Sequence, residues 1–147
     1  MSSLSATQRT LRVLKEQGRV CAIVERWNPY GGPQGVRQDL FGIVDVLALD
    51  RSRGFVGIQC FTTAWVEHWK KLTEERAQES IDWLTTPGGH LELWGWRKVK
   101  VKRGGKALVW RPRIKEIVLN NLTLVIKDHT IDRAEHCSTL PYMTLKE

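Results

Sequence analysis

The sequence predicts an α/β domain in which a mixed central sheet is flanked by helices. Helix-like and strand-like segments alternate along the chain, in the order helix, strand, hairpin, helix and further strands. The 147 residues are enough for one packed core. We therefore expect a single domain over residues 1–147, with a core at about 5–98 and a basic hairpin and C-terminal extension at about 97–147.

The amino-acid composition indicates a globular protein, and its charge indicates the kind of partner. The chain is 41% hydrophobic and 27% charged, which is typical of a globular domain and excludes a disordered chain. No apolar run approaches the roughly 20 residues that a membrane-spanning helix needs, and the N-terminus shows no secretory signal. The formal net charge is +7, so we expect an anionic partner, in the cytoplasm and away from membranes.

The first third of the chain begins with a helix. Ser5 can cap a helix that runs to about Gln17, where Gly18 is a C-terminal stop signal. Residues 19–27 are strand formers with apolar side chains on both faces, so they predict a central strand. Residues 28–38 are rich in glycine and predict a loop.

The middle of the chain predicts a hairpin followed by a helix. Residues 39–49 and 55–61 are runs of strand formers, and a short polar turn that ends in Gly54 joins them. Residues 65–79 carry apolar and aromatic side chains at helical spacing. The apolar pattern continues from there to a break at Pro87.

The last third predicts further strands. Residues 90–96 form a strand that continues out of the core to about residue 102. The chain then turns at two glycines and returns through residues 107–110, and a last strand-like run covers 114–126 with an interruption at a pair of asparagines. From residue 128 onward the chain is polar, with weak helix or coil character.

The predicted hairpin contains the residues with the clearest chemistry. If its turn centres near Ser52, Asp45 on one strand lies opposite Gln59 on the next. Asp45 interrupts a run that otherwise predicts a buried strand, and a buried carboxylate is costly unless it is paired, hydrogen-bonded or bound to a cation. Asp45 and Gln59 are therefore candidate ligands of a cation.

Two further acids are candidates for the same site. Strand alternation puts Asp39 on the face of Asp45, and Glu25 stands among apolar residues of the preceding strand. Carboxylate and amide oxygens are suitable ligands for Mg²⁺. Structural roles remain open at this point, because Asp39 could begin a strand through a local hydrogen bond and Glu25 could pair with Arg26 at a sheet edge.

These residues resemble those of a nuclease family. The stretch from Asp45 to Leu49, with Gly57-Ile58-Gln59 on the next strand, resembles the second and third motifs of the PD-(D/E)xK nuclease superfamily. The string from Arg37 to Asp45 is similar to small Holliday-junction-resolvase-like nucleases of phages and prophages. The resemblance covers about residues 5–98 and implies a restriction-endonuclease-like fold, metal-dependent cleavage of DNA, a homodimer and, for a phage protein, the host cytoplasm.

The resemblance also implies a set of site residues. In the family, a strand aspartate and a (D/E)xK tripeptide hold a divalent metal across a hairpin. The corresponding ligands of Mg²⁺ or Mn²⁺ in this chain are Asp45, the Gln59 side chain and the backbone carbonyl of Cys60. The first helix offers no obvious inward acid, so Glu25 substitutes for it, and Asp39 completes the site or holds waters.

The chain departs from the family's pattern in the third motif. Gln59 replaces an acid, and Phe61 replaces the lysine that positions or activates the attacking water. Lys70 or Lys71 on the following helix would take the role of that lysine. These departures leave two hypotheses, an endonuclease and a catalytically degenerate DNA-binding module on a nuclease fold.

A second candidate surface lies in the basic hairpin. Residues 97–115 contain nine basic side chains and no acid, and the lysines at 98, 100 and 102 alternate with valines, so we expect them on one strand face. Such a ribbon fits the phosphate backbone of duplex or branched DNA. The alternatives are a solvated charged hairpin and a surface that docks on an acidic protein. The expected DNA-binding residues are Arg97, Lys98, Lys100, Lys102, Arg103, Lys106, Arg111 and Arg113.

Overall fold

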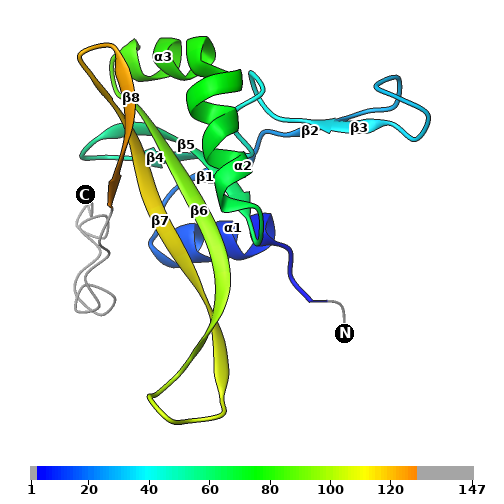
Figure 1. Ribbon diagram of the computed structural model, residues 1–147, viewed down its shortest axis with the longest axis vertical. Helices are drawn as coiled ribbons and strands as arrows, with labels where there is room; N and C mark the ends of the chain where they lie inside the picture. Colours follow the sequence, from blue (N-terminus) through cyan, green and yellow to red (C-terminus); the bar gives the residue numbers. More distant parts are fainter. Residues whose placement is uncertain (1–2, 129–147) are drawn as a thin grey trace, which may run out of the picture.

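The computed structural model describes residues 3–128, and its main feature is a six-stranded mixed sheet with helices on both faces (Figure 1). The strands are β1 (Cys21–Ile23), β2 (Arg26–Asn28), β3 (Val36–Gln38), β4 (Val46–Asp50), β5 (Gly54–Phe61), β6 (Gly89–Lys100), β7 (Leu108–Asn120) and β8 (Thr123–Asp128). The helices are α1 (Ala6–Glu16), α2 (Trp65–Lys70), a π-helical turn η1 (Lys71–Glu75) and α3 (Ala77–Thr85). The predicted mixed sheet flanked by helices is confirmed.

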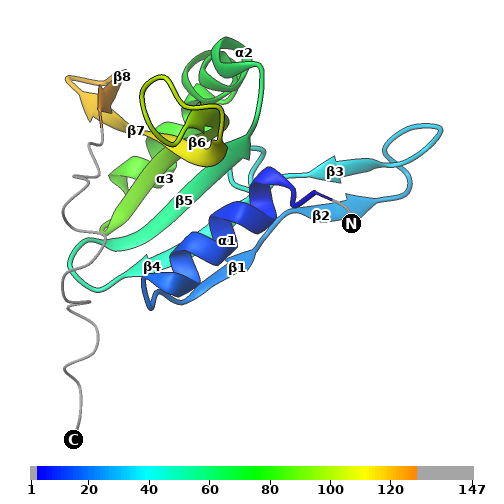
Figure 2. The ribbon, with the colours of Figure 1, turned by 90° about the horizontal axis from the view of Figure 1, so that it is seen from below.

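The order of the strands explains the two helical layers. The sheet runs β1-β4-β5-β6-β7-β8, and its neighbouring strands are antiparallel except for β5 and β6. A parallel pair needs a crossover, and α2, η1 and α3 form it. One hydrophobic cluster, around Leu14 and Trp94, lies under α1, and a second, around Leu72 and Trp83, lies under the crossover (Figure 2). Among residues 3–128, no helix is both long and apolar enough to cross a membrane.

The first helix forms as the sequence predicts. Ser5 and Gln8 make a reciprocal capping box, in which the backbone N of Gln8 donates to Ser5 Oγ (3.2 Å) and the backbone N of Ser5 donates to Gln8 Oε1 (2.9 Å). Gly18 follows the helix with φ of 73°, the left-handed conformation that favours glycine. Trp96 Nε1 donates to Thr10 Oγ1 (2.9 Å), which ties the helix to the sheet.

The prediction of one central strand over residues 19–27 is wrong. The chain forms β1, which pairs with β4 at the edge of the large sheet, and then β2, which pairs with β3 in a separate two-stranded sheet. Val24 N still donates to Asp45 O (2.8 Å), and after it the chain leaves the sheet. The β2–β3 hairpin projects from the body (Figures 1 and 2). Part of the expected loop is therefore strand, and Trp27 packs on Gly35, where a Cβ would lie 2.3 Å from the Trp27 ring.

The strand that enters the β4–β5 hairpin is shorter than predicted. It begins at Val46, because residues 39–44 form a tight turn closed by a hydrogen bond from Ile43 N to Leu40 O (3.0 Å). Phe41 and Gly42 at the centre of the turn have φ of 55° and 74°, the pattern of a type I′ turn. Asp39 therefore reaches Asp45 by way of a turn, whereas we expected strand alternation to bring it there.

The helical segment is interrupted, whereas the sequence predicts one helix over residues 65–79. After α2 the chain widens into η1, and at Arg76 it leaves helical geometry (φ −117°, ψ 32°) before α3 begins. Ser80 Oγ donates to Leu72 O (2.6 Å) across this break. A π-helical turn inside a helix is uncommon and is frequently found at functional sites.

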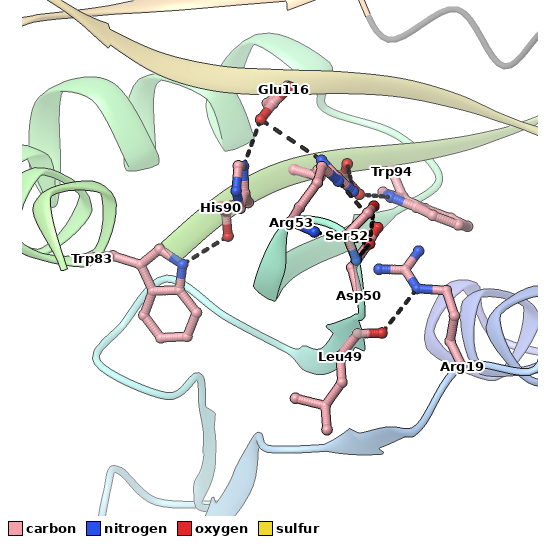
Figure 3. Close-up of polar contacts among 10 residues, drawn as sticks. Arg19, Leu49, Asp50, Ser52, Arg53, Trp83, His90, Trp94 and Glu116 are labelled. Carbon is pink, nitrogen blue, oxygen red and sulfur yellow. Dashed lines mark hydrogen bonds and ion pairs between the residues drawn. The ribbon is translucent and has the colours of Figure 1, made fainter. Parts of the chain in front are cut away.

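A network of charged side chains fixes the turn between β4 and β5 (Figure 3). Arg53 lies at its centre, since its Nε donates to Asp50 Oδ2 (3.1 Å) and its Nη2 donates to Glu92 Oε2 (3.1 Å). Its Nη1 lies 3.8 Å from Glu116 Oε1. Asp50 Oδ1 also accepts a hydrogen bond from the backbone N of Ser52 (2.9 Å). The network ties the turn to β6 and β7.

The register of the hairpin is the predicted one. Val46 pairs with Ile58, and Asp45 N donates to Ile58 O (2.9 Å). Asp45 and Gln59 therefore lie opposite each other, as the position of the turn indicates.

The packing of α3 on β5 leads to a first testable prediction. A Cβ at Gly57 would lie 2.6 Å from Val44 Cγ2 and 2.8 Å from Trp83 Cζ2. We expect Gly57→Ala to lower the free energy of unfolding by about 1–3 kcal/mol, because the core at this point has no room for a methyl group. Urea unfolding would show a lower midpoint at constant slope, and an unchanged midpoint would contradict the packing described here.

Candidate metal site

Three carboxylates meet near the C-terminal end of β5. One oxygen from each of Glu25, Asp39 and Asp45 lies within 4.8 Å of the others. Asp45 directly precedes β4, Asp39 precedes the tight turn, and Glu25 follows the backbone contact between Val24 and Asp45. The structure thus brings together the three acids that the sequence singled out. Glu25 pairs with Arg37 (Oε1 to Nη1, 3.1 Å), whereas we considered Arg26 as its partner.

The side chain of Gln59 lies beside these acids with one oxygen unsatisfied. Gln59 is only 1% exposed, and its Nε2 donates to Asp39 Oδ2 (3.1 Å). Its Oε1 is buried and has no hydrogen-bond partner within the described part of the chain. Such a buried acceptor costs about 1–3 kcal/mol. Three carboxylates and a free amide oxygen fit a hard divalent cation, which takes oxygen ligands.

The two aspartates of the site titrate as a pair. Asp45 Oδ2 accepts a hydrogen bond from Cys60 N (2.9 Å). Burial, and then the neighbouring Asp39, raise the pKa of Asp45 to about 7. Burial also acts to raise the pKa of Asp39, but hydrogen bonds from Asp45, Lys71 and Gln59 outweigh it, and the pKa of Asp39 is lowered. Like charges this close hold one proton between them, and a bound cation would favour its release.

Of the two candidate lysines, the structure places Lys71 at the site. Lys71 Nζ donates to Asp39 Oδ2, and its side chain is about one-third exposed. Lys70 is exposed, and no contact between it and the acids is present in residues 3–128. Lys71 is the first residue of η1, so the π-helical turn presents it to the acids. The sequence left these two neighbouring lysines undecided.

Phe61 occupies the position that the resemblance to the nuclease superfamily aligns with a lysine. The Phe61 side chain is buried, and its ring stacks on His68 with the centroids 4.3 Å apart and the planes at 9°. Trp65 packs on the same ring with a centroid distance of 5.1 Å. Burial, and then the charge of Lys71, lower the pKa of His68. A buried aromatic stack supplies no positive charge at this position.

The thiol of Cys60 is not a ligand candidate. It is buried in the cluster under α1, and burial raises its pKa, which disfavours the thiolate that binds metals. The backbone carbonyl of Cys60 as a third ligand stays a prediction.

A cavity of about 590 Å³ opens beside the acids. Its wall includes Asp39 and four cationic side chains, which are Arg26, Arg37, Lys71 and Arg76. Sequence reasoning did not find this cavity. The only signal was the position of Arg26 and Arg37 next to two of the acids, and nothing in the sequence indicates that Arg76 folds back to the same place.

Comparisons of the chain with protein-family models, with curated proteins and with solved structures found no match. Function is therefore inferred from the site and from the charged surface.

The basic hairpin forms at the end of β6 and β7 and extends beyond the rest of the sheet (Figure 1). All eight side chains that we expected to bind DNA are exposed. Lys98 and Lys100 share one face of β6, but Lys102 lies in the turn that connects the strands, so the prediction of three lysines on one strand is wrong for Lys102. The strand ends at Lys100, and Val101 N donates to Ala107 O (3.0 Å) at the start of the connection.

Three arginines of the hairpin, Arg97, Arg111 and Arg113, lie on its other face. Arg97 pairs directly with Arg111 in the ladder, and like charges at this position destabilise a sheet. By strand alternation they share the sheet face that carries α2. Arg113 follows two residues after Arg111, and its guanidinium lies 4.6 Å from the centroid of the Trp65 ring of α2. The arginine face and the acidic site therefore lie on the same side of the sheet.

Proposed function

We propose that the protein is a DNA endonuclease of the PD-(D/E)xK type, dependent on Mg²⁺ or Mn²⁺. The observation that supports this most strongly is the meeting of three carboxylates with the unsatisfied oxygen of Gln59. The mixed sheet, with Asp45 and Gln59 opposite each other across a hairpin, agrees with the restriction-endonuclease-like fold that the resemblance implies. The homodimer and the cytoplasmic location belong to the same proposal.

Each residue of the site has a defined role in this proposal. Asp45, Asp39, Glu25 and the Gln59 oxygen would hold the cation, which when bound would lower the pKa of the attacking water and offset negative charge on the phosphate. Lys71 supplies a positive charge beside Asp39 and takes the place of the lysine that Phe61 displaces. The Cys60 N–H holds one oxygen of Asp45, so its carboxylate is oriented before the substrate arrives.

The basic hairpin would bind the DNA backbone. Arg97 and Arg111 lie opposite each other although no acid occurs in residues 97–115. A phosphate between them would offset their repulsion. Since these arginines lie on the face of the acidic site, DNA bound along them would be directed toward the acids.

The test is a cleavage assay with labelled duplex, four-way-junction and single-stranded DNA. Each substrate is incubated with and without Mg²⁺ or Mn²⁺, beside the Asp45→Asn variant. Metal-dependent cutting that is lost in the variant is the expected result. Absence of cutting with both metals on all three substrates would overturn the proposal.

Phe61 favours a second candidate function. A buried aromatic side chain at this position suits a protein that has lost catalysis and keeps only DNA binding. In that case the wild type and Asp45→Asn would bind DNA equally and neither would cut. Lys71 beside Asp39 favours the enzyme over this alternative.

The two neighbouring lysines make a matched pair of variants. We expect Lys71→Gln to reduce the cleavage rate by about 10²-fold or more, because its charge is next to the acids, and Lys70→Gln to stay within about twofold of wild type. Cleavage rates at saturating metal measure the difference. Equal cleavage rates for the two variants would contradict a catalytic role of Lys71.

A further inference from the structure

We infer that the cavity beside the acids is a subsite for one unpaired nucleotide, so that the substrate enters the site as a single DNA strand. This inference rests on the proposed function only in taking DNA as the partner. The cavity volume of about 590 Å³ lies within the range of roughly 300–1,000 Å³ of small-ligand sites. This volume is sufficient for one nucleotide.

The charges around the cavity suit a phosphate group. Arg26 and Arg37 come from the β2–β3 hairpin, and Lys71 and Arg76 come from the helical segment on the opposite side. Lys71 pairs with Asp39 and Arg37 pairs with Glu25, so the net positive charge around the cavity comes from Arg26 and Arg76. The cations therefore converge from two separate elements on one space, as they would around a bound anion.

The Arg76 side chain lies over the tight turn, in close contact with Gly42. A Cβ at position 42 would lie 2.8 Å from Arg76 Nε, so the guanidinium packs directly on the backbone of this turn. Gly42 also has φ of 74°, which glycine adopts without strain. Arg76 also pairs with Glu79 at 3.4 Å, but both side chains are solvent-accessible, so this pair does not prevent a phosphate contact.

The conformation and exposure of Phe41 are a second, independent observation that supports a nucleotide subsite. Its φ is 55°, a left-handed conformation that is costly for a bulky side chain, and 64% of its surface is exposed. Asparagine or glycine at the same turn position would form the turn with less strain. The edge of the ring packs on Trp83, with the centroids 6.3 Å apart, and this contact leaves most of the ring exposed in the wall of the cationic cavity. A nucleotide base can stack on such an exposed ring.

The experiment measures binding in EDTA, so that cutting does not interfere. The probes are a fluorescein-labelled oligothymidylate and a labelled duplex of the same length, and fluorescence anisotropy gives their dissociation constants over a series of salt concentrations. The variants are Phe41→Asn and the double variant Arg26→Gln/Arg76→Gln. Arg12→Gln/Lys15→Gln on exposed α1 removes the same number of charges outside the cavity and is the matched control.

Phe41→Asn is expected to weaken single-strand binding at least about fivefold, to leave duplex binding within about twofold, and to keep or raise the melting temperature. The arginine variant is expected to reduce the slope of log affinity against log salt for the single strand by about 1.4 relative to the control. The melting temperatures show that the variants fold.

Three results would overturn the inference. They are a wild-type protein that does not bind the single strand, equal loss of single-strand and duplex binding in Phe41→Asn, and an arginine variant that behaves like the control. Failure of the proposed function is a separate result, because a protein that cuts no DNA can still bind the single strand through Phe41 and the two arginines. Conversely, DNA cleavage by the wild type together with unchanged single-strand binding in these variants would support the nuclease proposal and contradict the nucleotide subsite.

Discussion

Arg53→Met is expected to lower the free energy of unfolding by about 3–5 kcal/mol, although Arg53 lies in a turn far from the acidic site. Glu92 is 1% exposed and receives a hydrogen bond from Arg53 Nη2 (3.1 Å). Trp94 Nε1 also donates to Glu92 (Oε1, 3.1 Å), but it brings no positive charge. Without the guanidinium, the buried carboxylate of Glu92 would lose this charged hydrogen bond.

Chemical unfolding followed by circular dichroism measures this effect. Arg12→Met is the control, because Arg12 pairs with Glu16 at 3.4 Å on the exposed side of α1, and loss of such a pair costs less than about 1 kcal/mol. Adding Glu92→Gln to Arg53→Met should recover part of the loss, since the amide keeps an acceptor for Trp94 without the charge. Equal unfolding midpoints for the Arg53 and Arg12 variants would contradict the structural role of the network.

The network also has a pH dependence with a definite sign. Burial acts to raise the pKa of Asp50, but hydrogen bonds from Ser52 and Arg53 outweigh it, so the pKa of Asp50 lies well below its usual value of 3.8. The folded state therefore gains stability from ionised Asp50 above about pH 4, and this contribution is lost as the pH falls below that value.

Asp45→Asn is expected to reduce metal-dependent cleavage by at least about 10³-fold without destabilising the fold. The variant keeps an oxygen that can accept the Cys60 N–H hydrogen bond but loses the charge that holds a cation. The pKa of Asp45 is raised by burial to about 7, which means that ionised Asp45 disfavours the folded state. We therefore expect the variant to be at least as stable as the wild type at pH 8.

The pH dependence of folding stability shows whether the loss of cleavage in Asp45→Asn comes from the lost charge or from misfolding. The folded protein binds its proton more tightly than the unfolded chain, so wild-type stability falls as the pH rises from about 4 to about 7. In Asp45→Asn this decrease should be absent. Unfolding midpoints in EDTA at pH 5 and pH 8, together with the cleavage rate, test both parts. Wild-type cleavage or a lower midpoint at pH 8 in the variant would contradict the assignment of Asp45.

The features that could be predicted from the sequence depend on local signals. The polar turn centred near Ser52 determines which residues of β4 and β5 face each other, so the pairing of Asp45 with Gln59 followed from counting. The capping signal at Ser5 and the asparagine pair at 120–121 are equally local. The helix α1 begins directly after Ser5, and β7 ends at the first of the two asparagines, as expected. Residues 129–147, including the predicted weak helix or coil, lie outside the described residues.

The features that could not be predicted depend on contacts between distant segments. Residues 19–27 look like a central strand because their apolar side chains satisfy both faces, yet the chain bends at Glu25 and the strand becomes an edge. Phe41 at a left-handed turn position contradicts its own conformational preference, so the turn before β4 had no sequence signal. The choice between Lys70 and Lys71 depends on the ion pair of Lys71 with Asp39, which lies 32 residues earlier in the chain.

The parallel pairing of β5 with β6 has an evolutionary consequence. The four proposed cation ligands all come from residues 25–59, before the crossover, whereas Lys71 belongs to the crossover itself. An insertion or deletion between residues 62 and 88 would therefore move the lysine while leaving the ligands in place. The same scaffold could gain or lose catalytic strength by changes in one connecting segment, with its capacity to hold a cation intact.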